Sequence, residues 1–207
     1  MKLFDKSYPV RFFASIVISI VSTLISSCSN SAGSDNSGGL GGTHFYSLSS
    51  LAQSTDNKSA LKIGVGPIEI PRLLNRPQIV ARKNETEIII SEVNQWGGSF
   101  KEDLLQTLID NLSTLKKTDN VEQYPWKFSY KPDYQIKINF ERFDGELGKN
   151  IILKARWRLL KNNREVIVRR TRITTPILGD KSYKSYVKAQ TKALILLSKK
   201  IASYIKS

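Results

Sequence analysis

The apolar residues of this chain change their period along residues 43–207, and the order of these changes restricts the folds that the chain can adopt. Alternation with period two, which is typical of half-buried strands, occurs within residues 44–92 and 134–173. Helical spacing occupies residues 99–117 and 181–205. The order strands, helix, strands, helix predicts an α+β fold with a mixed, mostly antiparallel sheet and both helices packed on one face.

Turn residues divide the alternating segments into strands. Lys83-Asn84-Glu85 predicts a short hairpin connection, and Asn162-Asn163 predicts a tight turn because asparagine tolerates positive φ. We therefore expect strands over residues 44–48, 60–70, 77–82, 86–92, 134–140, 151–159 and 165–173.

The two helices have distinct sequence signals. Ser99 is the natural N-cap of the first, and Glu102 three residues later completes a capping box. The second turns a row of lysines outward, at positions 184, 188, 192 and 199. This row has two interpretations, a solvated helix face or a surface attracted to anionic lipid.

Residues 1–27 have the composition of a targeting segment. Lys2, Lys6 and Arg11 precede an apolar stretch, residues 12–25, that is shorter than the roughly 20 residues of a membrane-spanning helix. Leu24-Ile25-Ser26-Ser27-Cys28 then resembles the bacterial lipobox, which implies that Cys28 is lipidated and becomes the first mature residue. The alternative is an ordinary secretory signal, or a short anchor helix, with a chance cysteine.

Residues 28–42 follow as a Gly- and Ser-rich segment with one charge, which predicts a flexible tether. Its root-mean-square reach is roughly 20 Å, enough to lift a domain clear of a membrane surface. Ser29 stands where an aspartate would favour retention in the inner membrane, so we expect a lipid anchor in the outer membrane, on its periplasmic side. Residues 43–207 are expected to form a single domain.

The residue counts speak against several kinds of chemistry. One cysteine and one histidine cannot form an internal disulfide or a Cys/His zinc site, and nucleophilic catalysis would depend on His44 alone. The strings Ser113-x-x-Lys116 and Ser185-x-x-Lys188 lack the companion motifs of penicillin-interacting enzymes, and no Gly-rich phosphate loop is present. We expect no enzymatic activity, no cofactor and no metal.

A net charge of +14 predicts an anionic partner. The candidate anion-binding residues lie on the last predicted hairpin and are Lys154, Arg156, Arg158 and Arg169. If Asn162-Asn163 is the loop, Arg156 lies opposite Arg169, and such a like-charge pair is destabilising. Either an anionic partner or a solvated face with interleaved carboxylates such as Glu141 accounts for it. Nucleic acid is the less favoured partner, because the aromatic residues fall on the apolar rows and the chain is expected to be exported.

Two adjoining segments resemble a known family. Ile63-x-Val65-x-Pro67-Ile68-x-Ile70-Pro71 and Leu74-Asn75-Arg76-Pro77-Gln78-Ile79-Val80-x-Arg82 resemble the signature V-x-V-x-P-V-x-L-P-x-Y-L-D-R-P-Q-I-V-x-R of the ABC-type transport auxiliary lipoproteins, the PqiC/YmbA type. Segments around residues 134–145, 153–159 and 186–202 follow in the order of that family. The resemblance implies a non-enzymatic periplasmic lipoprotein of the outer membrane that works with an MCE-type transporter in moving lipids between two membranes.

The resemblance also suggests where a partner binds. The candidate partner-binding residues are Leu74, Arg76, Pro77, Gln78 and Trp96. The chain lacks the acidic residue of the family signature before Arg76, and around Trp96 it keeps only the tryptophan. The alternative is that Pro71 and Pro77 only shape a connection.

Two questions stay open in the sequence. One is whether the chain forms a homo-oligomer. The other is a second functional class, an assembly lipoprotein that plugs or chaperones an outer-membrane barrel or lipopolysaccharide, in which the basic hairpin would contact phosphate groups.

Overall fold

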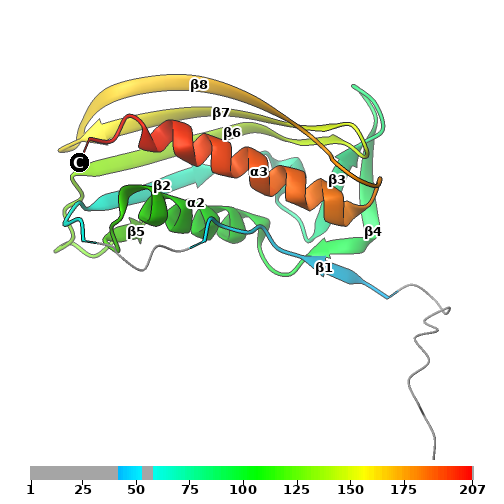
Figure 1. Ribbon diagram of the computed structural model, residues 1–207, viewed down its shortest axis with the longest axis horizontal. Coiled ribbons are helices and arrows are strands. Elements are labelled where there is room, and N and C mark those ends of the chain that lie inside the picture. Colours follow the sequence, from blue (N-terminus) through cyan, green and yellow to red (C-terminus); the bar gives the residue numbers. More distant parts are fainter. Residues whose placement is uncertain (1–41, 53–57, 207) are drawn as a thin grey trace, which may run out of the picture. The chain divides into compact units, whose positions relative to one another are not determined.

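A computed structural model describes residues 42–52 and 58–206 of the chain. In chain order the elements are β1 (His44–Tyr46), β2 (Ile63–Glu69), the 3-10 helix η1 (Arg72–Leu74), β3 (Gln78–Arg82), β4 (Ile88–Trp96), α2 (Phe100–Lys116), β5 (Val121–Gln123), β6 (Tyr134–Glu146), β7 (Asn150–Lys161), β8 (Arg164–Pro176) and α3 (Tyr183–Ala202) (Figure 1). The α+β prediction is confirmed. The predicted leader, Cys28 and all but the end of the predicted tether lie outside the described residues.

The eight strands form one mixed sheet organised around β6. On one side β6 pairs antiparallel with β7, which pairs antiparallel with β8. On its other side β6 pairs in parallel, first with β2 and near its end with β3. Strand β5 extends the sheet beyond β2, and β4 and β1 extend it beyond β3.

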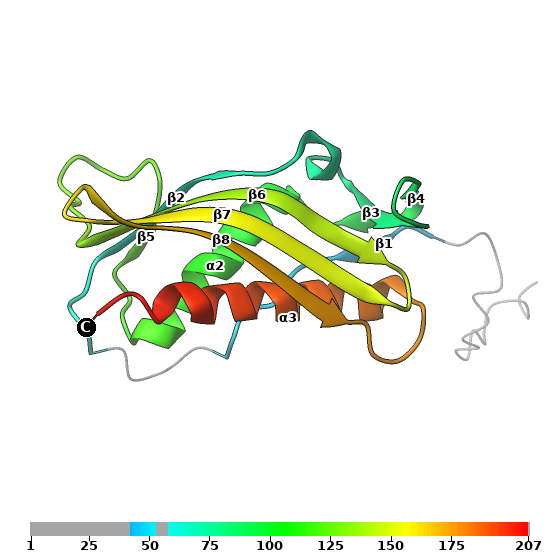
Figure 2. The ribbon, with the colours of Figure 1, turned by 90° about the horizontal axis from the view of Figure 1, so that it is seen from above.

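Both helices cover the same face of this sheet, as predicted. Helix α3 packs against β7 and β8, α2 packs against β2 and β5, and the two helices contact each other. Figure 2 looks onto β6–β8, with α2 behind them. The inward side chains of β6 and β7, including Phe140, Phe143 and Trp157, are fully buried between sheet and helices. We call the opposite face of β6–β8, which no helix covers, the outer face.

The helix ends follow from local hydrogen bonds. The Ser99 hydroxyl accepts a hydrogen bond from the backbone N–H of Glu102 at 3.4 Å, which confirms the predicted N-cap. The side chain that ties this turn to the rest of the fold is Asp103, whose carboxylate accepts from the Leu48 N–H at 2.7 Å. At the start of α3, hydroxyl groups of Ser182 and Ser185 donate to Asp180 and hold the pKa of that carboxyl below its usual range.

A buried hydroxyl joins α3 to the sheet. The Tyr186 O–H donates to the Val80 carbonyl at 2.9 Å and accepts from the Gly145 N–H at 2.9 Å. Tyr186 has no solvent exposure, and this burial raises the pKa of its phenol. One side chain thus satisfies backbone groups of both β3 and β6.

No helix within residues 42–52 and 58–206 combines the length and the apolar character that a membrane crossing requires.

Candidate anion-binding face

The outer face carries a dense array of positive charge. Seven basic side chains of three neighbouring strands point to this face, as the strand register shows: Lys137, Arg142, Lys154, Arg156, Arg158, Arg170 and Arg172. Several lie directly opposite one another. Lys137 faces Arg158, and Arg156 faces Arg170. Lys154 lies between Arg142 on β6 and Arg172 on β8.

These juxtapositions oppose folding. Like charges directly across a β-ladder are destabilising, by an amount comparable to the roughly 0.2–1 kcal/mol that a favourable pair contributes. The face contains four such pairs in register. An anion bound at this face would offset the cost.

Carboxylates compensate only part of the array. Glu141 pairs with Arg170 at 3.0 Å, and Glu165 pairs with Arg158 at 3.3 Å. The third carboxylate is that of Asp144. It accepts from the Arg142 Nε at 2.6 Å and from the Arg82 Nε at 2.8 Å, and it raises the pKa of the Arg82 guanidinium. The four cations without a carboxylate partner in the described part of the chain are Lys137, Lys154, Arg156 and Arg172.

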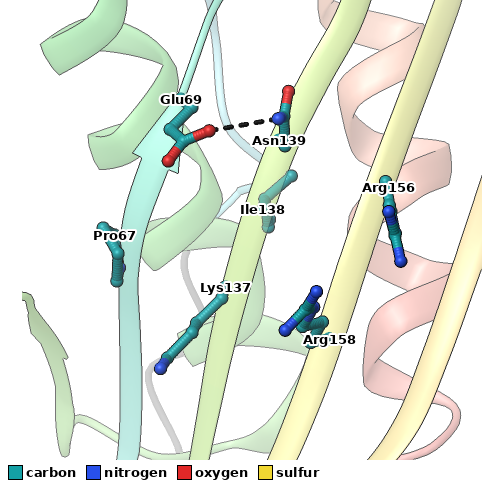
Figure 3. A pocket seen from close by; sticks show the side chains of 7 residues that line it. All are labelled: Pro67, Glu69, Lys137, Ile138, Asn139, Arg156 and Arg158. Atoms are coloured by element: carbon teal, nitrogen blue, oxygen red, sulfur yellow. Dashed lines mark hydrogen bonds between the residues drawn. The ribbon is translucent and has the colours of Figure 1, made fainter.

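A hollow of about 310 Å³ lies on this face, over β2, β6 and β7, at one end of the array (Figure 3). Lys137, Arg156 and Arg158 line it from β6 and β7, together with Pro67, Glu69, Ile138 and Asn139. The carboxylate of Glu69 accepts from the Asn139 amide at 3.1 Å, so part of its charge is engaged. The hollow thus presents three cations and one hydrogen-bonded carboxylate.

One residue that was predicted for the site, Arg169, does not lie on the outer face. Asn162 and Asn163 do form the β7–β8 turn with positive φ, but Val166 is an extra residue in β8, a β-bulge that shifts the register by one. Arg156 therefore lies opposite Arg170, and the predicted pairing with Arg169 is wrong. Arg169 lies opposite Trp157 on the helix side, with its guanidinium 5.8 Å from the centre of the Tyr204 ring.

Sequence reasoning also missed four members of the array. Lys137 follows the alternation of β6 and was detectable, but Arg142, Arg170 and Arg172 reach the outer face only because of two bulges, at Glu141 and Val166. The predicted Lys154, Arg156 and Arg158 do share this face.

The predicted partner-binding residues only partly come together. Arg76, Pro77 and Trp96 line a second hollow of about 480 Å³, beside Phe45, whose side chain is 66% exposed. The remaining lining residues are Asn75, Gln95, Gly97, Gly98, Ser99 and Phe100. Of the other two predicted residues, Leu74 is buried in the core and Gln78 lies in β3 without lining the hollow.

The β5–β6 connection is a surface feature that the sequence analysis did not detect. Trp126 lies against β2 at Gly64, where a Cβ atom would come within 2.5 Å of the indole ring. The Tyr130 hydroxyl lies 3.0 Å from the Ile63 carbonyl and 2.8 Å from the Asn120 carbonyl, and burial raises its pKa to about 12. Between these two anchors Phe128 is 99% exposed. A run of four aromatics at alternate positions in residues 124–130 was the available signal.

The described residues contain no group of three or more His, Cys, Asp or Glu side chains that could hold a metal ion. The arginine guanidinium groups and lysine ammonium groups of the outer face are suited to binding an anion.

Known structures share this fold. The crystal structure of an uncharacterized protein matches with a TM-score of 0.67 and 18% identity, covering 80% of this chain and 99% of the other. Protein XCC0632 from Xanthomonas campestris matches with a TM-score of 0.62 and 15% identity, covering 78% of this chain and 94% of the other. No curated protein matches the sequence significantly.

The match to a sequence family says more about this chain than the shared fold does. Residues 46–202 match the family described as ABC-type transport auxiliary lipoprotein component, and the chain belongs to this family. This match confirms the family resemblance that residues 63–71 and 74–82 carry. The family description assigns an auxiliary role in ABC-type transport.

Proposed function

We propose that this chain is an outer-membrane lipoprotein, facing the periplasm, that acts as an auxiliary component of an MCE-type ABC system moving lipids between membranes. The observation that carries the proposal is the family match over residues 46–202, preceded by a lipobox-like sequence that ends at Cys28. In this role the chain binds partners and performs no catalysis.

The proposed mechanism is tethered scaffolding. Two or more acyl chains give stable membrane anchoring, which a lipidated Cys28 would supply. Residues 29–42 would then hold the domain within roughly 20 Å of the membrane, which raises its effective concentration near a transporter that reaches the same membrane.

We assign the contact with the MCE component to the hollow beside Phe45. Phe45 and Arg76 line it, and aromatic and arginine side chains are common anchors of protein interfaces. Trp96 also lines the hollow but is only 5% exposed. Leu74 and Gln78 do not line this hollow: Leu74 is buried at the end of η1, and Gln78 is the first residue of β3. This surface contrasts with the basic outer face, because Arg76 is the only charged residue among those that line it.

The anchor is tested by a Cys28→Ala chain. We expect it to lose acylation, measured by mass spectrometry, and to stop floating with neutral phosphatidylcholine vesicles. Continued acylation of this variant, or its flotation with neutral vesicles, would show that Cys28 is not the anchor.

The partner is tested by crosslinking in intact envelopes, followed by purification of this protein. Recovery of an MCE-domain protein is expected, and a Phe45→Ser chain should recover much less of it. Phe128→Ser is the matched control, because that side chain is also exposed but belongs to the β5–β6 connection. Recovery of an outer-membrane barrel without any transporter component would instead support an assembly or chaperone role.

A further inference from the structure

The outer face is a cationic surface of defined geometry whose charges are only partly paired. Five of its seven basic side chains are arginines, and four of the seven lack a carboxylate partner among the described residues. Adjacent strands are about 4.8 Å apart, and alternate residues along a strand are about 6.7 Å apart. Three strands and three rows of cations therefore cover a patch of roughly 10 by 13 Å.

This spread distinguishes among anions. A single phosphate group in the hollow would contact Lys137, Arg156 and Arg158, but it would leave Lys154 and Arg172, in the row beyond Arg156, uncompensated. A surface that presents several phosphate groups side by side compensates the whole patch. The guanidinium fork also matches the geometry of phosphate oxygens.

Apolar side chains accompany the cations. Val168 stands in the same row as Lys137 and Arg158 and is 37% exposed, and Val166, the bulge residue, is 52% exposed. Exposed aliphatic groups among basic residues suit the boundary between lipid headgroups and acyl chains.

We propose that the outer face of β6–β8 docks on a bilayer through the phosphate groups of anionic phospholipids. This inference deepens the proposed function by naming the chemistry that the basic face recognises, and it rests on that function for the tether that brings the face to a membrane. Docking removes the cost of the like-charge pairs and holds the domain flat on its sheet face, with α2 and α3 directed away from the lipid.

The first test measures which face approaches lipid. The acylated protein carries its only cysteine at the anchor, so a new cysteine can take a polarity-sensitive fluorophore. We place it at Val168→Cys on the outer face or at Lys192→Cys on α3. In vesicles of neutral phosphatidylcholine with added phosphatidylglycerol, we expect lipid-borne quenchers to quench the probe at 168 and not the probe at 192. Equal quenching at both positions, or no dependence on the anionic lipid, would overturn the proposal.

The second test compares two variants with the same loss of charge. Lys154→Gln/Arg156→Gln/Arg172→Gln removes three uncompensated cations from the outer face. Lys184→Gln/Lys188→Gln/Lys192→Gln removes three exposed cations from α3. Each basic residue near an anionic membrane changes the docking equilibrium by roughly a factor of five, so the outer-face variant should lower the ratio of docked to undocked protein on the order of 100-fold. The α3 variant should change it little. An equal loss in both would show that net charge, and not this face, controls docking.

Two further experiments distinguish a lipid surface from a small phosphate ligand, and the docking proposal from the proposed function. Millimolar inorganic phosphate should not release the docked probe, because it lacks the array of groups; efficient release would mean that the face binds a small phosphate ligand. The Cys28→Ala chain should still float with anionic vesicles and should not float with neutral ones. Its failure to float with anionic vesicles would refute docking, whereas failure to recover an MCE component on crosslinking would refute only the proposed function.

Discussion

Tyr186→Phe isolates one hydroxyl that connects α3 to two strands. The substitution keeps the ring and removes only the oxygen, which donates to Val80 and accepts from Gly145. Both backbone groups lie in the interior, so they lose their partner without gaining water. Each buried polar group left unsatisfied costs about 1–3 kcal/mol, and the hydroxyl no longer has to be desolvated, so we expect a net loss of about 2–4 kcal/mol.

The assay is the unfolding, by heat and by urea, of a soluble form that starts at Ser29. Circular dichroism and tryptophan fluorescence monitor the unfolding. A loss of this size should lower the melting temperature by about 2–4 °C for each kcal/mol in a domain of this length. The slope of the denaturant dependence should not change, because the substitution leaves the buried area almost the same.

The matched control is Tyr204→Phe. Tyr204 lies just beyond the end of α3, and its hydroxyl has no hydrogen-bond partner among the described residues, so its removal should change stability by less than about 0.5 kcal/mol. If Tyr186→Phe costs no more than this control, the two hydrogen bonds contribute nothing net, and the argument that they join the layers is wrong.

Three other substitutions test particular contacts. Gly64→Ala places a Cβ 2.5 Å from the Trp126 ring, so the β5–β6 connection must shift; we expect a loss of about 1–3 kcal/mol and a change in tryptophan emission. Asp144→Asn removes the buried carboxylate between Arg82 and Arg142, which are partly exposed, so the expected loss is about 1–3 kcal/mol, measured by urea unfolding, with Glu146→Gln as a surface control. For Asp180→Asn the expectation concerns pH: because serine hydroxyls lower the pKa of Asp180 from 3.8, its contribution is complete above that pH and is lost as the pH falls through the folded-state value, so the stability difference from the wild type should shrink in acid. A difference that grows below pH 3.8 would contradict this assignment.

The helices were predictable because their signals are local. A serine N-cap and an apolar stripe with helical spacing need no knowledge of the rest of the fold, and both helices begin within two residues of the expected positions. The hairpin turn at Asn162-Asn163 was predictable for the same reason. The short strand β5 was not, because three residues that pair only with β2 have no periodicity of their own.

Long-range contacts account for what the sequence did not reveal. The hydrogen bonds of Tyr186 join residues that are 41 and 106 positions apart, and no local pattern marks them. The family signature likewise pointed to Leu74, which packs inside, and gave no indication of Phe45, which lines the same region from β1. A motif shows that a segment matters, but burial decides which of its side chains a partner can reach.

The bulge at Val166 shows how one extra residue determines the chemistry of a whole face. Side chains alternate between the two faces of a strand, so without the bulge Arg170 and Arg172 would point inward, against α3 and the buried Trp157 row. With it, Thr171 takes the inward position, and its hydroxyl accepts the indole N–H of Trp157 at 3.0 Å. The core thus gains the acceptor that a buried tryptophan needs, and two arginines join the outer face. The same register shift that satisfies the interior therefore also concentrates the positive charge on the outer face.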